Sequence, residues 1–276
     1  MNRNADLGTF LRSRRARLYP ADVGLPTTGR RRVPGLRREE LAAVAGVSAG
    51  YYARLEQGRQ VTASPSVLDA LARGLRLTAD ERTHLYTLAG TADTRSVAGQ
   101  PDGAADPRFR RIVDVFGDTP ALLCGPYTDV LLVNAAASFL LTDFSSLPAG
   151  DRYAIKWHLL APETRELYGA DWEGVTIDMI GMLRLQSARH PGDPRMRDLV
   201  TELAARSPLF RRQWAEHRVS AGLRDRKVLN HPDAGKVAIS VELLILHAAP
   251  ENTLVLLIPD DAQGFETALH KFAAAA

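Results

Sequence analysis

The sequence has a single cysteine in 276 residues and no long apolar run. Cys124 cannot form an intramolecular disulfide, and because it lies in an apolar, strand-like stretch we interpret it as a small core residue rather than a redox centre. Nowhere do 18 consecutive apolar residues occur, and no basic-then-apolar leader opens the chain. We therefore expect neither a membrane span nor secretion, but a cytoplasmic protein.

Motifs that bind cofactors or metals are also missing. There is no G-x-G-x-x-G, no P-loop and no H-E-x-x-H, and the histidines of the last two thirds of the chain are never three or four residues apart. A helical metal pair needs that spacing. We therefore expect no cofactor, no metal site and no enzymatic activity.

One short stretch does match a catalytic motif. Residues 46–50, GVSAG, fit the G-x-S-x-G nucleophile elbow of serine hydrolases. That elbow needs a strand entering it, whereas the preceding residues 38–45, REELAAVA, are strong helix formers with almost no β-branched residue. The sequence favours a different interpretation, in which Gly46 ends one helix and Ser48 is the N-cap of a second helix over 49–57. Two short helices joined by a tight turn are typical of a motif that places its second helix in the DNA major groove.

The charge distribution favours a nucleic-acid partner. Residues 1–90 contain 15 Arg, no Lys and 8 Asp plus Glu, a balance of +7, whereas the remaining 20 basic and 24 acidic residues give −4. We predict that Ala49, Gly50 and Arg54 approach base edges, with Arg able to pair with guanine. Phosphate-contacting or supporting residues are predicted to be Arg31, Arg32, Arg37, Arg38, Ser48, Tyr51 and Arg59.

Hydrophobic periodicity divides the chain into two domains. Residues 1–90 predict five short helices, including a helix starting at Ser64-Pro65 and another opening with the capping box of Thr78 and Glu81. Residues 91–106 are small, polar and rich in Pro and Gly, which is typical of a linker. Residues 107–276 form the second domain.

The second domain predicts an α+β fold. Strands are expected over 120–125, 129–133, 227–231, 236–247 and 253–259, with turns at 232–235 and 250–252. Two strands before and three after a helical middle suggest a five-stranded antiparallel sheet whose concave face is covered by helices.

Segments in both halves of the sequence resemble a known family. The run GRRRVPGLRREELAAVAGVSAGYYARLEQGR, followed by PSVLDALARGL and LTADERTHLYTLAG, resembles the lambda-repressor-like domain of xenobiotic-response-element (XRE) helix-turn-helix regulators. The later segments GDRYAIKWHLL, ELYGADWEGV, RHPGDPRMRDLVTELAARSPLFRRQWAEHRV and Asn230-His231-Pro232 are similar to the ligand-binding domain of the MmyB-like subgroup. The resemblance implies a transcription regulator with a PAS-like sensory domain. The family often has Trp where this chain has Val133, a departure that affects the sensory half.

A PAS-like cup predicts a small apolar or amphipathic ligand, for example one like an acyl chain. The expected lining is Asn134, Phe139, Trp157, Met179, Leu183, Trp214 and His217, although apolar residues at this spacing are also typical of core. For His217 a structural hydrogen bond is an equally good interpretation.

Three functions stay open. The first is a ligand-controlled regulator that binds an inverted-repeat operator in double-stranded DNA as a homodimer. The second is a constitutive repressor whose C-terminal domain only dimerises, and the third is an enzyme tethered to DNA.

Overall fold

The computed structural model describes residues 3–26, 35–59, 63–90, 106–223 and 226–275. The chain divides into two compact units. The first comprises 1–96 with 184–199 and 214–221, and the second comprises 97–183, 200–213 and 222–276. The expected domain division at 90 and 107 stays a prediction, and residues 91–105 of the expected linker lie outside the described residues.

The N-terminal part of the first unit is helical, as predicted. Its helices are α1 (Arg3–Arg15), the 3-10 turn η1 (Pro20–Val23), α2 (Arg38–Val44), α3 (Ala49–Glu56), α4 (Pro65–Gly74) and α5 (Ala79–Leu88). The predicted helix starts are confirmed, because the side chains of Ser48, Ser64 and Thr78 each accept a hydrogen bond from a backbone amide in the first turn. Gly46, which has a φ of +64°, lies between α2 and α3 in the left-handed conformation that glycine adopts without strain.

Backbone packing brings α1 and α3 unusually close. A Cβ atom on Gly8 would lie 2.4 Å from the carbonyl oxygen of Glu56, and one on Gly58 would lie 3.0 Å from that of Asn4. The apolar side of α3, with Tyr52 and Leu55 fully buried, packs into the same core. Because neither Gly8 nor Gly58 has a Cβ atom, the backbones of α1 and α3 can approach each other this closely.

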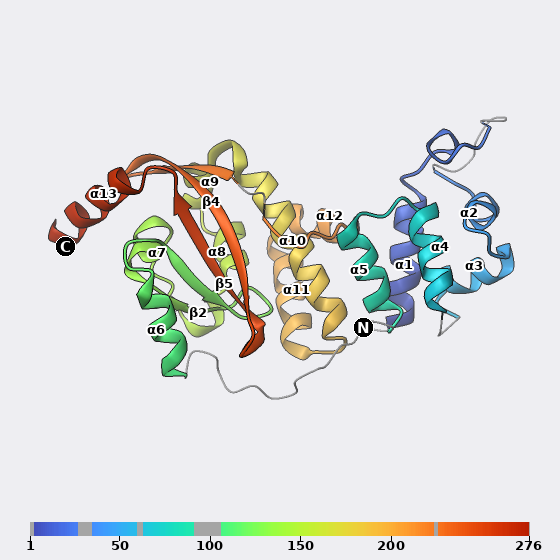
Figure 1. The fold of residues 1–276 in the computed structure, drawn as a ribbon, viewed down its shortest axis with the longest axis horizontal. Coiled ribbons are helices and arrows are strands. Elements are labelled where there is room, and N and C mark those ends of the chain that lie inside the picture. Colours follow the sequence, from blue (N-terminus) through green and yellow to red (C-terminus); the bar gives the residue numbers. More distant parts are fainter. Residues whose placement is uncertain (1–2, 27–34, 60–62, 91–105, 224–225, 276) are drawn as a thin grey trace. The chain divides into compact units, whose positions relative to one another are not determined.

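The rest of the chain is α+β. Its elements are α6 (Pro107–Val115), β1 (Ala121–Cys124), β2 (Val130–Val133), α7 (Ala135–Leu140), η3 (Ala149–Asp151), α8 (Ala154–Leu160), α9 (Glu163–Tyr168), η4 (Gly169–Asp171), α10 (Trp172–Arg189), α11 (Pro194–Arg206), α12 (Pro208–Ala215), β3 (Arg226–His231), β4 (Gly235–Leu246), β5 (Ala249–Pro259) and α13 (Ala262–Ala275). Figure 1 shows β4 and β5 as the two long strands of the sheet.

The predicted five-stranded antiparallel sheet is confirmed. Its strand order is β2-β1-β5-β4-β3, and every pair of neighbouring strands is antiparallel. The turn expected at 250–252 is wrong, because the chain reverses at 247–248 and β5 begins at Ala249. Pro250 is tolerated in β5 because residues 250–252 have no partner in the register of either neighbouring strand: β1 pairs with 253–256, and the β4 register shifts from Thr253 to Ala249.

Both faces of the sheet carry apolar side chains. One face packs Leu122, Val237, Ile239 and Leu257 against α7, α8, α9 and α13. The opposite face packs Leu123 and Leu256, among others, against Phe109 and Val113 of α6. The expectation of a single helix-covered face is therefore incomplete, since α6 covers part of the second face.

The close approach of α1 to α3 gives a test of this packing. Gly8→Ala should destabilise the full-length protein by about 1 to 3 kcal/mol, because the added methyl must push the Glu56 backbone away. Gly50→Ala is the matched control, because in α3 the new methyl would meet only the end of the Arg54 side chain at 3.8 Å. Calorimetric unfolding should show a lower melting temperature for the first variant and no loss for the second. Equal melting temperatures for Gly8→Ala and the wild type would contradict the packing described.

Candidate nucleic-acid interface and ligand pocket

The outward side of α3 carries small residues at its start and one long cation a turn later. Ser48 Oγ accepts the amide of Tyr51 at 3.1 Å, which fixes the first turn of the helix. Ala49, Gly50 and Arg54 are exposed, and the Arg54 guanidinium lies 5.9 Å from the centre of the Tyr51 ring. Such a helix presents little bulk at its leading end, so its backbone can approach a flat surface closely.

The other residues predicted to meet DNA have different surroundings. Arg37 and Arg59 are exposed, and the amide of Arg37 donates to the carboxylate of Glu40 at 2.7 Å. The side chain of Arg38 is held by Glu56. Arg31 and Arg32 lie outside the described residues.

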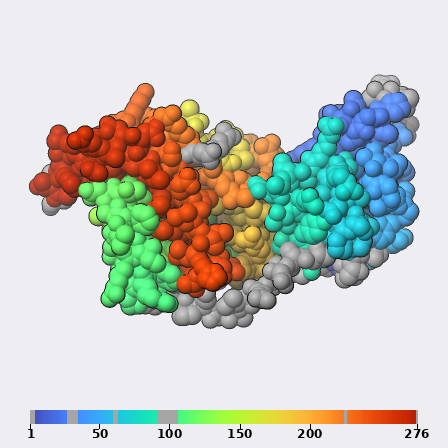
Figure 2. All heavy atoms as spheres, viewed as in Figure 1, coloured from blue at the N-terminus to red at the C-terminus, as the bar shows by residue number. Residues whose placement is uncertain are grey.

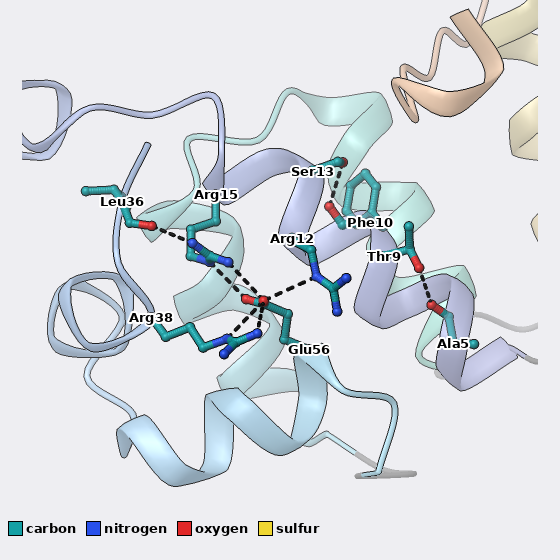
Figure 3. Close-up of polar contacts among 9 residues, drawn as sticks. All are labelled: Ala5, Thr9, Phe10, Arg12, Ser13, Arg15, Leu36, Arg38 and Glu56. Atoms are coloured by element: carbon teal, nitrogen blue, oxygen red, sulfur yellow. Dashed lines mark hydrogen bonds and ion pairs between the residues drawn. The ribbon is translucent and has the colours of Figure 1, made fainter. Parts of the chain in front are cut away.

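A buried carboxylate joins the elements that surround α3 (Figure 3). The Glu56 carboxylate is inaccessible to solvent and receives two hydrogen bonds of 2.9 Å from Arg15 of α1. Arg38 at the start of α2 contributes two further contacts of 3.0 Å, and Arg12 lies 3.5 Å away. Arg15 also donates to the carbonyl of Leu36. We call Glu56 with Arg12, Arg15 and Arg38 the Glu56 cluster.

The electrostatics of the Glu56 cluster favour the charged carboxylate. Burial alone would raise the pKa of Glu56, but the hydrogen bonds and charges of Arg15, with the hydrogen bond of Arg38, outweigh it and hold that pKa below its usual value. Arg15 is affected in the opposite sense, since Glu56 raises its pKa despite burial. Both groups are therefore charged at neutral pH.

Sequence reasoning missed the Glu56 cluster, although a signal for it exists. Tyr52, Leu55 and Glu56 occupy positions i, i+3 and i+4 of α3, so Glu56 shares the buried face of the helix. A carboxylate in that position requires a partner, and the chain offers several arginines nearby.

The second unit contains a pocket of about 910 Å³. Its wall is formed by α7, α9, α13 and the turn between β3 and β4, and its floor is largely apolar, with Phe139, Leu167, Leu269 and Phe272. The Phe139 ring lies 5.1 Å from Phe272, centre to centre. A volume of this size falls within the range of about 300 to 1,000 Å³ that small-molecule sites occupy.

His231 fixes one wall of this pocket. The amides of Asp233 and Ala234 both donate to its Nδ1, at 3.1 and 3.0 Å. Nε2 must therefore carry the proton, and it donates to the carbonyl of Phe139 at 2.8 Å. The histidine thus joins the β3–β4 turn to α7, a role that the quoted His-Pro pair did not reveal.

Of the seven residues predicted to line a ligand site, only Phe139 lines this pocket. Asn134 is the N-cap of α7, and its Oδ1 accepts the amides of Ala121 and Ala137. Its Nδ2 donates to the carbonyls of Gly117 and Thr119. The full hydrogen-bonding capacity of the amide is therefore used within the protein.

The remaining predicted ligand residues are dispersed. Trp157 is buried in α8 and donates to Glu163 at 3.2 Å, while Met179 and Leu183 are buried on α10. Trp214 and His217 belong to the first unit, where the Arg184 guanidinium lies 3.8 Å from the centre of the Trp214 ring. Burial, together with the nearby charge of Arg184, lowers the pKa of His217 to about 4, so the ring is neutral at pH 7.

Other candidate chemistry is limited within the described part of the chain. Burial raises the pKa of the Cys124 thiol to about 12, which leaves it protonated. Among the described residues no group of three His, Cys, Asp or Glu side chains could hold a metal ion. No described helix is both long and apolar enough to cross a bilayer.

These features define a class of protein: a DNA-binding transcription regulator in which a helix-turn-helix precedes a ligand-binding domain. Residues 6–85 match the family described as a helix-turn-helix domain, and residues 105–271 match the MmyB-like transcription regulator ligand binding domain. The chain belongs to the MmyB-like family of transcription regulators, as the sequence predicted. Both matched families are regulatory and neither is an enzyme family. No curated protein matches the chain closely enough to count as a relative.

The Glu56 cluster makes a prediction about stability and its dependence on pH. Glu56→Gln should lower the free energy of unfolding at pH 7 by about 2 to 4 kcal/mol, because it leaves partly buried arginines without a counter-charge. Since the folded-state pKa is depressed, the stabilisation is fully present above the unfolded-state value of 4.5 and is lost as the pH falls through the folded-state value.

Urea unfolding of the full-length protein followed by circular dichroism measures this difference. Glu39→Gln is the control, because Glu39 is exposed on α2. A difference between wild type and Glu56→Gln that stayed constant from pH 7 to pH 3 would rule out the ion pairs as its source.

Proposed function

We propose that this regulator reads an inverted-repeat operator as a homodimer, through α3, and that a small apolar or amphipathic molecule bound in the pocket changes its affinity for DNA. The observation that supports the proposal most strongly is that Ala49, Gly50 and Arg54 are exposed together on the outward side of α3. On its inward side, Glu56 of the same helix is paired with Arg15 and Arg38.

The proposed base contacts follow from side-chain size and reach. The small Ala49 and Gly50 let the start of α3 enter the major groove, and Arg54 is long enough to pair with the O6 and N7 atoms of a guanine. Ser48, Tyr51, Arg37 and Arg59 flank this side and are proposed to contact phosphates or support the helix. Arg38 is proposed to act mainly through Glu56, with its exposed part facing the backbone of the DNA. Arg31 and Arg32 stay predicted phosphate contacts.

Arg54→Ala tests the recognition helix. A bidentate pair with guanine is worth about 1 to 3 kcal/mol of discrimination, so the variant should lose about 5- to 150-fold in preference at one base pair per half-site. Operators are first selected from a random-sequence library with the wild-type protein, and affinities are then measured by fluorescence anisotropy. Arg59→Ala is the comparison, because loss of a phosphate contact should weaken all sequences alike and reduce the salt slope by about one. Uniform weakening by Arg54→Ala would show that it contacts phosphate and not a base.

Dimerisation is supported by an uncovered part of the sheet. α6 packs over β1, β2 and part of β5, whereas Val228, Leu244 and Ile258 point from the same face and are 43%, 44% and 39% exposed. The β4–β5 hairpin that carries two of them reaches the surface in Figure 2 (orange-red). Two copies joined by this face would offer two recognition helices, which a usefully specific operator requires.

Ile258→Glu tests the proposed dimer face. The new carboxylate would have to be buried between subunits, so the variant should sediment as a monomer at micromolar concentrations at which the wild type is a dimer. Val115→Glu on α6, where Val115 is 83% exposed, should leave the dimer intact. If Ile258→Glu still forms a dimer, the dimer interface does not include this face. If the wild type is a monomer, the proposed homodimer is wrong.

Ligand control requires a difference in ligand affinity between two states of the regulator. A molecule that binds both states equally cannot change operator affinity, however tightly it binds. Coupling in such systems is usually about 1 to 3 kcal/mol, which corresponds to about 5- to 150-fold in DNA affinity. The pocket supports the proposal because it has the volume and the apolar floor of a ligand site.

A further inference from the structure

The pocket has an asymmetric distribution of charge. Its lining includes Asp143, Glu163, Glu166 and Asp233, all of them exposed, and no Lys or Arg. Two of these carboxylates have polar partners on the protein, since Glu163 accepts from Trp157 and Asp143 accepts from the amide and hydroxyl of Ser145. No hydrogen bond or ion pair to a described residue engages the carboxylates of Glu166 and Asp233.

Aromatic rings line the same pocket as these four exposed carboxylates, which we call the acidic rim. Phe272 of α13 is 47% exposed and lines the pocket next to Phe139. The face of an aromatic ring attracts a positive charge, and a quaternary or protonated ammonium group is favoured where rings and carboxylates occur together. His231 adds no positive charge, because its two nitrogens are committed to the Phe139 carbonyl and to backbone amides.

We propose that the ligand of this pocket is a cationic amphiphile, with an ammonium group at the acidic rim and an apolar body on the phenylalanine and leucine floor. An amphiphile with a carboxylate head would place its charge in a pocket lined by four carboxylates and by no Lys or Arg. This inference rests on the proposed function only in taking the pocket as the regulatory site.

The test compares probes that differ only in head group. Dodecyltrimethylammonium, dodecanol and dodecanoate are titrated into the full-length protein by calorimetry, below the concentrations at which they form micelles. We expect the ammonium probe to bind at least about tenfold more tightly than dodecanoate at low ionic strength. Added salt should shrink that preference, because exposed charges are screened.

Two variants separate the pocket from the overall charge of the protein. Glu166→Gln with Asp233→Asn should reduce the preference for the cation at least threefold and leave dodecanol binding unchanged. Glu173→Gln with Glu266→Gln removes the same charge from exposed positions of α10 and α13 that do not line the pocket, and it should have no effect. Equal or tighter binding of dodecanoate, binding of neither charged probe, or an equal effect of the control pair would overturn the proposal.

The same probes distinguish this inference from the proposed regulation. If the ammonium probe binds but leaves operator affinity unchanged, the ligand class stands and regulation through the pocket is wrong. If dodecanoate binds more tightly and shifts operator affinity, regulation through a ligand stands and the cationic class is wrong.

Discussion

The Glu56 carboxylate is the interaction on which the DNA-facing half of the molecule depends. It is buried on the inner side of α3, and its charge is balanced by Arg15 from α1 and Arg38 from α2. An unpaired charge in that position would be very costly, so α1 and α2 must pack so that both arginines reach the carboxylate. The close backbone approach of Gly8 to the Glu56 carbonyl holds the same end of α3 against α1. The residues on the outer side of α3, Ala49, Gly50 and Arg54, are exposed and take no part in this packing, so they can serve in recognition.

The second unit is held together mainly by apolar packing on its sheet. Its sheet carries apolar residues on both faces, and helices from before, between and after the strands cover them. The pocket forms where α7, α9 and α13 meet the β3–β4 turn. His231 joins the two, because it accepts two hydrogen bonds from amides of the turn and donates one to the Phe139 carbonyl of α7. These hydrogen bonds fix one wall of the pocket, whereas α13 contributes the half-exposed Phe272.

Local signals in the sequence predicted the secondary structure well. Ser48, Ser64-Pro65 and the Thr78 capping box act within one helical turn, and apolar runs bounded by turn residues predicted the strands of the sheet. Pro250 was misassigned to a turn because the sequence cannot show that the registers of both β1 and β4 pass over it. Glu56 and the pocket were missed for a related reason: their partners come from segments far apart in the chain. Asn134 was recognised as an important polar residue, but only the fold reveals that its hydrogen bonds are all internal.

We propose above that Arg54, presented by α3, pairs with a guanine in the major groove. The most direct measurement is a double-mutant cycle across the interface, in which each operator guanine in turn is replaced by 7-deazaguanine, which lacks the N7 acceptor. Wild-type and Arg54→Ala proteins are then compared on the same set of duplexes. If Arg54 pairs with a guanine, the loss of N7 at one guanine in each half-site should weaken binding by the wild type several-fold and leave binding by Arg54→Ala unaffected. Losses that are additive at every guanine would contradict it.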